Sequence, residues 1–292
     1  MSRTTTVHLP QLGDIEAAYE LNREYSVSKP TCDARLTATV NLLAIEPLGH
    51  GSISLRSAGA REHFTYWDSA IMALEVMKGL GIKKAFAQGT SQGGVDCRAD
   101  GAFGAGYGYS SECTILGLIP VGTHMDCESE DSQRKGCWRP LPQLKPLIDL
   151  WDSDCETPGF VVDESWCRVV GSGGFGPFAT GENADFWVQT LQAIYQGDEG
   201  RRKVRMALIC LLERDALLLR LRDIRCPVHW LQGTLDTEFG TTVPAEQIRL
   251  FTRSPEAKLE VVQGGTHYLS ATHPEIVNAA ILDMVGKYSG LN

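Results

Sequence analysis

The stretch "AQGTSQGG", residues 87–94, is the strongest indication of how this chain folds. It places Ser91 between Gly89 and Gly93 in the pattern G-x-S-x-G, directly after the apolar run "KKAFAQG". Glycines at these positions let a strand turn sharply into a helix, which leaves the serine hydroxyl exposed at the carboxyl edge of a sheet. The pentapeptide is a weak signal by itself, and the strand before it strengthens it. The pattern predicts a nucleophilic serine on an α/β scaffold.

Strands alternate with helices along most of the chain, which predicts an α/β fold with a mainly parallel sheet. The predicted strands are 41–47, 83–89, 114–122, 226–233 and 258–265, and amphipathic helices are predicted at 64–77 and 274–288. The strand at 41–47, "NLLAIEP", is short and largely apolar, so we expect it to be buried on both faces.

The middle of the chain departs from this alternation. Residues 127–215 are rich in Cys, Trp, Asp and Gly, with helical patterns at 185–196 and 201–218. We therefore predict a core formed by residues 1–126 and 216–292, and a cap lobe formed by residues 127–215. A chain of 292 residues is long enough to bury a substantial core in this arrangement.

Composition excludes several classes of function. The formal net charge of −9 argues against nucleic acid or an anionic membrane as the main partner. No apolar run approaches the roughly 18 residues of a membrane span, and the N-terminus lacks an apolar segment of the signal-peptide type. Nine cysteines without a C-x-x-C pair are typical of reduced thiols, so we predict a cytoplasmic protein. No metal spacing, phosphate-binding loop or dinucleotide fingerprint is present, and we expect no cofactor.

Two further residues complete a pattern with Ser91. Asp236 follows the predicted strand at 226–233, and His267 follows the one at 258–265. The order Ser, Asp, His, with each residue in a loop after a strand, is that of the α/β-hydrolase triad. A serine hydroxyl becomes a good nucleophile when histidine takes its proton and a carboxylate orients that histidine.

Other polar residues compete for these roles. Asp126 in "GTHMD" is the main alternative acid, because some hydrolases draw it from that earlier strand, and Glu46 is another. His50 in "LGHGS" is interpreted as a turn residue near the pocket rim. The tryptophans are interpreted as packing residues of the cap lobe.

Several longer blocks make the resemblance to a known family specific. They are "YELNREYSVSKPT", "NLLAIEPLGHG", "FTYWDSAIMALEVMKGLGIKKAF", "GTSQGG", "IPVGTHMD", "YQGDEGRRKVRMA", "CPVHWLQGTLD" and "GGTHYLSATHPE". The chain resembles the small α/β-hydrolases of fungal secondary-metabolite gene clusters, including those for host-selective toxins of plant pathogens. The resemblance implies Ser91 as nucleophile, Asp236 as acid and His267 as base, acting on a small acyl ester or thioester. The backbone N–H of Gln92 would then donate to the oxyanion.

The first departure from that family follows "SKPT". Family members continue there into a buried strand of the "LVLVNSF" type, whose loop supplies one oxyanion-hole N–H. This chain has "CDARLTATVNLLAIEP" instead, so a central strand and one donor are predicted to be missing. Loss of one such donor typically lowers the rate by a factor of about 10² to 10³.

The second departure follows Ser91. Family members have a helix resembling "WIVARMALLAPD", whereas residues 95–107 are "VDCRADGAFGAGY". One permitted set of codons for these residues, shifted by one base, encodes the family's helix. We interpret the segment as an out-of-frame translation, and the alternative is a genuine glycine-rich loop.

Two hypotheses of function follow. The first is a serine hydrolase of the esterase, thioesterase or acyl-transferase type in secondary-metabolite or toxin biosynthesis, with an apolar lobe that selects the acyl chain. The second is a catalytically impaired product of a damaged or incorrectly assembled gene, at most a binding protein.

Overall fold

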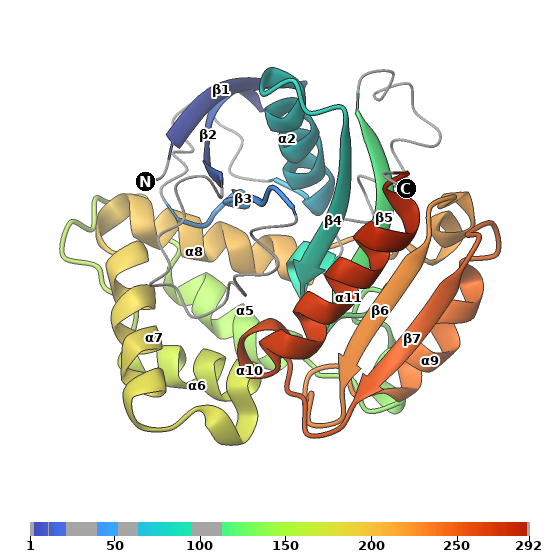
Figure 1. Cartoon of the computed structure of the whole chain (residues 1–292). Helices are drawn as coiled ribbons and strands as arrows, with labels where there is room; N and C mark the ends of the chain where they lie inside the picture. Colours follow the sequence, from blue (N-terminus) through green and yellow to red (C-terminus); the bar gives the residue numbers. More distant parts are fainter. Residues whose placement is uncertain (1–2, 11, 22–39, 52–63, 95–112, 291–292) are drawn as a thin grey trace.

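The strands form two sheets in the computed structural model, which describes residues 3–10, 12–21, 40–51, 64–94 and 113–290 (Figure 1). The first sheet has the order β1-β2-β3, with β1 at Arg3–Leu9, β2 at Gly13–Leu21 and β3 at Leu43–Ile45. The second has the order β4-β5-β6-β7, with β4 at Lys84–Thr90, β5 at Thr114–Val121, β6 at Val228–Gly233 and β7 at Ala257–Val262.

The four-stranded sheet is parallel throughout and carries the predicted serine turn. Every residue of β6 is buried, because helices and loops cover both faces. Leu118 and Trp230 contribute to the core on one face, and Ile119 and Leu231 to the core on the other. Helix α11, Pro274–Tyr288, packs on the second face and crosses the sheet in Figure 1. Because carboxyl ends of parallel strands share one edge, residues that follow β4, β6 and β7 are brought together.

The antiparallel sheet covers one end of the core. Its β1–β2 hairpin has alternating side chains turned inward, among them Val7, Leu9 and Ile15. Helix α2, Tyr66–Gly79, packs beside β1 and begins with a capping box between Thr65 and Asp68. In this box the Thr65 hydroxyl accepts the N–H of Asp68, and the Asp68 carboxylate accepts the N–H of Thr65.

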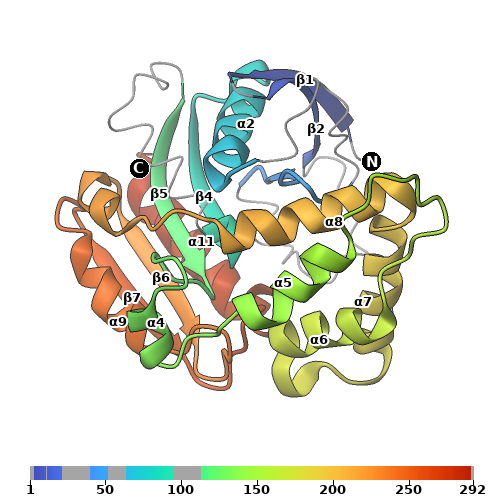
Figure 2. The same cartoon turned by 180° about the vertical axis from the view of Figure 1, so that it is seen from behind.

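Helices dominate the chain between β5 and β6. They are α4 at Glu130–Arg134, α5 at Leu141–Leu150, α6 at Glu164–Phe175, α7 at Gly181–Ile194 and α8 at Gly197–Leu212. Helices α5 to α8 share a separate apolar cluster and gather on one side of the molecule (Figure 2). Short helices α9 at Thr242–Gln247 and α10 at Leu269–Thr272 lie in the loops after β6 and β7. Within the described part of the chain, no helix has the length and apolarity to cross a membrane.

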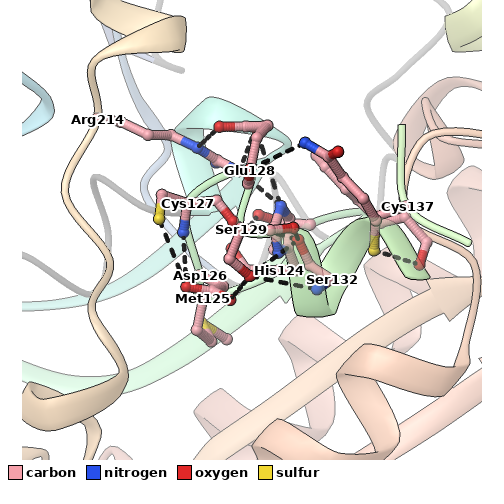
Figure 3. Close-up of polar contacts among 12 residues, drawn as sticks. His124, Met125, Asp126, Cys127, Glu128, Ser129, Ser132, Cys137 and Arg214 are labelled. Atoms are coloured by element: carbon pink, nitrogen blue, oxygen red, sulfur yellow. Dashed lines mark hydrogen bonds and ion pairs between the residues drawn. The ribbon is translucent and has the colours of Figure 1, made fainter. Parts of the chain in front are cut away.

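A buried ion pair joins the two ends of the predicted cap lobe. Arg214 donates from Nη2 to Oε1 of Glu128 at 2.7 Å and from Nε to Oε2 at 3.2 Å (Figure 3). A second interaction links Arg214 Nη2 to Nε2 of His124, which follows β5. The position where the chain leaves the sheet is therefore fastened to the position where it returns. The lobe boundaries at residues 127 and 215 stay a prediction.

The expectation that residues 41–47 form a strand buried on both faces is wrong. Strand β3 covers only Leu43–Ile45, and Ala44 at its centre is exposed. The physical reason is that β3 pairs only with β2 among the described strands and is not hydrogen-bonded to β4. The predicted missing strand after "SKPT" and the interpretation of residues 95–107 concern positions outside the described residues.

Candidate active site

Ser91 occupies a sharp turn between β4 and the helical residues 92–94. Its φ of 55° makes it the one non-glycine residue with positive φ in the described part of the chain. A backbone of this kind costs on the order of 1–3 kcal/mol and persists only when its surroundings impose it. The N–H of Ser91 donates to the Val121 carbonyl at 2.9 Å, which fastens the turn to β5.

The glycine at position 89 is required by the close return of the chain. A Cβ atom added to Gly89 would lie 2.0 Å from the carbonyl oxygen of Gly93. Any side chain there would push the turn open and move Ser91 from the sheet edge. The first glycine of the G-x-S-x-G pattern therefore has a steric explanation, whereas a Cβ atom added to Gly93 would meet no described atom within 4 Å.

His267 and Asp236 form a buried hydrogen-bonded pair in the loops after β7 and β6. Nδ1 of His267 lies 3.1 Å from Oδ2 of Asp236, and both residues are at most 6% exposed. Oδ1 of Asp236 also accepts the backbone N–H groups of Glu238 and Phe239 at 2.9 and 3.1 Å. These donors fix the orientation of the carboxylate, and its hydrogen bond with Nδ1 favours the His267 tautomer with its proton on Nδ1.

Gln232, at the end of β6, supports this pair and was not recognised from the sequence. Its Nε2 donates to Oδ2 of Asp236 at 2.7 Å, and its Oε1 accepts the N–H of Thr123 at 3.2 Å. Gln232 is fully buried and therefore needs partners within the protein, and these two bonds supply one for each end of its amide. A polar amide at the end of the buried strand "VHWLQG" was the available signal.

Asp126 and Glu46, the alternative acids, have other surroundings. The Asp126 carboxylate accepts the Ser129 hydroxyl at 2.6 Å and the Cys127 N–H at 2.9 Å, within its own turn (Figure 3). The carboxyl group of Glu46 lies against Gly51. Among the described residues, the carboxylate that hydrogen-bonds to His267 is that of Asp236.

Ser91, Gln92 and His267 line one cavity of about 840 Å³. Helices α5 to α8 supply much of its wall, which is mostly apolar and aromatic. Aromatic lining residues are Tyr66, Trp138, Trp166, Trp187, Tyr195, Phe239 and Tyr268. Three of the tryptophans interpreted as packing residues therefore also line this cavity. Its volume and apolar lining are typical of small-molecule sites.

A second polar group faces the same cavity near Ser91. Nδ1 of His50 lies 2.7 Å from the Tyr195 hydroxyl oxygen, and its Nε2 lies 3.3 Å from the Gln92 amide oxygen. Burial lowers the pKa of His50, so the neutral imidazole is favoured. His50 thereby links the turn after β3 to the serine turn. It also lines the cavity, and it was expected near the pocket rim from the sequence.

Comparison with known proteins establishes the fold. The chain has the α/β-hydrolase fold, and it is similar to a thermophilic esterase from Thermogutta terrifontis, with a TM-score of 0.69 and 16% identity over 98% of each chain. It is also similar to a hydrolase from Pseudomonas aeruginosa PA01, with a TM-score of 0.66 and 17% identity over 97% of this chain and 98% of that one. The chain is similar as well to an enol-lactonase from Burkholderia xenovorans LB400, with a TM-score of 0.66 and 14% identity over 97% of this chain and 100% of that one. No protein-family model and no curated protein sequence matches the chain.

Proposed function

We propose that this protein is a serine hydrolase that cleaves, or transfers, the acyl group of a small ester or thioester. The observation that carries the proposal is the position of Ser91 at positive φ in a cavity that His267 also lines, with His267 hydrogen-bonded to Asp236. The esterases and the lactonase of similar fold support the same class of reaction. The proposal includes a substrate from secondary metabolism, and the sequence resemblance to fungal toxin-cluster hydrolases is its support.

The proposed reaction assigns one role to each residue. Oγ of Ser91 attacks the acyl carbonyl carbon, and its proton passes to Nε2 of His267. Asp236 stabilises the resulting imidazolium, and the N–H of Gln92 donates to the oxyanion. Collapse of the tetrahedral intermediate breaks the bond to the alcohol or thiol, which takes the proton from His267. Water, or an acceptor alcohol, then repeats these steps on the acyl-enzyme.

The cavity lining supports an apolar acyl chain as substrate. Leu144, Leu147, Leu191 and Leu208 from the surrounding helices line it together with the aromatic residues. Burial of each additional methylene contributes about 0.8 kcal/mol. We therefore expect kcat/KM to rise from acetyl to hexanoyl esters of p-nitrophenol.

Hydrolysis of this ester series tests the proposal. Ser91→Ala is expected to abolish hydrolysis, and Ser165→Ala is the matched control because Ser165 lines the same cavity. Hydrolysis by the Ser91→Ala protein at the parent rate would reject the assignment. Equal rates for all chain lengths would reject the apolar acyl pocket.

One structural observation favours the second hypothesis, an impaired hydrolase. The described strands form two sheets with no hydrogen bonds between β3 and β4. In this hypothesis the facing edges of the two sheets have no other ladder partner, so unpaired backbone groups weaken the fold. Such a protein would bind acyl esters in the cavity without cleaving them at a useful rate.

A further inference from the structure

The cavity contains one carboxylate that the proposed reaction does not use. Glu238 lies two residues after Asp236, lines the cavity beside His267 and is partly buried. Among the described residues, its side-chain oxygens accept no hydrogen bond and form no salt bridge, and the positive charge that acts on the carboxylate is that of His267. Burial raises the pKa of Glu238, so a cationic group that pairs with its carboxylate would stabilise the ionised form.

Helix α6 brings this carboxylate against an aromatic ring. A Cβ atom added to Gly173 would lie 2.6 Å from Oε1 of Glu238, and one added to Gly174 would lie 2.1 Å from the Tyr268 ring. Two successive glycines therefore let the carboxylate and the ring approach the same stretch of helix. The pKa of Tyr268 is raised to about 12 by burial and secondly by the negative charge of Glu238, in agreement with their proximity.

Further aromatic rings line the same cavity next to Tyr268 and His267. The rings of Trp187 and Tyr268 are 6.0 Å apart, and those of Phe239 and His267 are 5.3 Å apart. Aromatic faces beside a carboxylate are the surroundings that proteins use for quaternary ammonium groups. No lysine or arginine occurs among the described lining residues, so no permanently charged cation there would repel an ammonium group.

We propose that Glu238, Tyr268 and Trp187 form a subsite for an organic ammonium group of the substrate. The substrate class is then an ester or thioester with a positively charged nitrogen on the portion that lies next to His267. This inference rests on the proposed function, because the bound ester is a substrate only if the protein is a hydrolase. Binding of the ammonium group can be measured without catalysis. The net charge of −9 would further favour the approach of cations over anions.

Binding to the Ser91→Ala protein tests the subsite separately from catalysis. The probes are butyrylcholine and 3,3-dimethylbutyl butyrate, which have the same shape and differ in the charge of one atom. Quenching of tryptophan fluorescence reports binding, because Trp138, Trp166 and Trp187 line the cavity. We expect Kd for butyrylcholine to be at least about tenfold lower than for the neutral ester.

Two variants on the Ser91→Ala background locate the subsite. Glu238→Gln keeps the size of the side chain and is expected to bring the two Kd values within about twofold. Gly173→Ala should have a similar effect, because its Cβ displaces the Glu238 carboxylate. Glu275→Gln removes the same charge from an exposed position on α11 and should preserve the discrimination.

Three results would overturn the inference. They are equal Kd values for the two probes, failure of both probes to bind, and discrimination that survives both Glu238→Gln and Gly173→Ala in folded protein. Absence of hydrolysis by the parent protein would reject the proposed function and leave this binding comparison to decide the subsite.

Discussion

Nδ1 of His267 lies 3.1 Å from Oδ2 of Asp236, although the two residues are separated by 31 positions in the chain. Parallel strands β6 and β7 produce this contact, because each of the two residues follows the carboxyl end of one strand. The Asp236 carboxylate is fixed by Gln232 and by two backbone N–H groups. The pair is thus held by the sheet and by the loop after β6.

Asp236→Asn is expected to lower kcat for ester hydrolysis by about 10³- to 10⁴-fold while the protein stays folded. The amide cannot stabilise the imidazolium, and it favours the wrong tautomer of His267. Asp126→Asn is the control and should retain most of the rate, because Asp126 has partners in its own turn. A larger loss in Asp126→Asn than in Asp236→Asn, with circular dichroism unchanged, would transfer the role of the acid to Asp126.

Arg214→Met should lower the free energy of unfolding by about 3–5 kcal/mol, because it leaves the buried Glu128 carboxylate without its cation. Adding Glu128→Gln to that variant should recover part of the loss. Urea denaturation of the parent, the two single variants and the double variant measures the coupling. Losses that simply add would contradict the view that this pair fastens the two ends of the lobe.

The free energy of unfolding should fall between pH 7.5 and pH 5.5, in part because of His229. Burial lowers the pKa of His229 in the folded protein, although its hydrogen bond to Glu260 opposes the effect. The unfolded chain therefore binds the proton more readily, and stability present above pH 6.5 is lost as the pH falls. His229→Gln should reduce this slope, whose limit for one proton is about 1.4 kcal/mol per pH unit. The same slope in both proteins would show that His229 does not contribute.

A repaired chain tests the interpretation of the two departures from the family that the sequence resembles. It would have "WIVARMALLAPD" after Gly94 and a "LVLVNSF" strand after Thr31. If the interpretation is correct, the repaired chain adds a central strand and a covering helix, and we expect higher solubility and faster ester hydrolysis. Sedimentation and initial rates compare the repaired and original chains. A soluble original chain that unfolds cooperatively and hydrolyses esters equally fast would reject the out-of-frame interpretation.

The predicted elements with the clearest periodicity are confirmed. The helix predicted at 274–288 is α11, and the strands predicted at 83–89, 114–122 and 226–233 are β4, β5 and β6. Long apolar patterns bounded by glycine or proline leave few alternatives. The β1–β2 hairpin was missed because Thr4, Thr5 and Thr6 obscure the alternation that begins at Val7.

The polar features of the site were less predictable. Ser91, Asp236 and His267 could be proposed because each follows a strand, and their catalytic roles stay predictions. The contacts of Gln232 and Glu238 are visible only in the folded structure. They depend on β6 lying beside β5 and on α6 lying beside the loop after β6. Such contacts join residues far apart in the chain, and no local pattern encodes them.

Labelling with a fluorophosphonate probe, followed by peptide mass spectrometry, is the most direct test of Ser91 as the nucleophile. We expect one phosphonylated residue, Ser91. The Ser91→Ala protein should show no labelling, and the His267→Ala protein should show strongly reduced labelling. The Ser165→Ala protein should label as the parent does. Labelling that persists in Ser91→Ala, or a folded parent protein that does not react, would contradict Ser91 as the nucleophile.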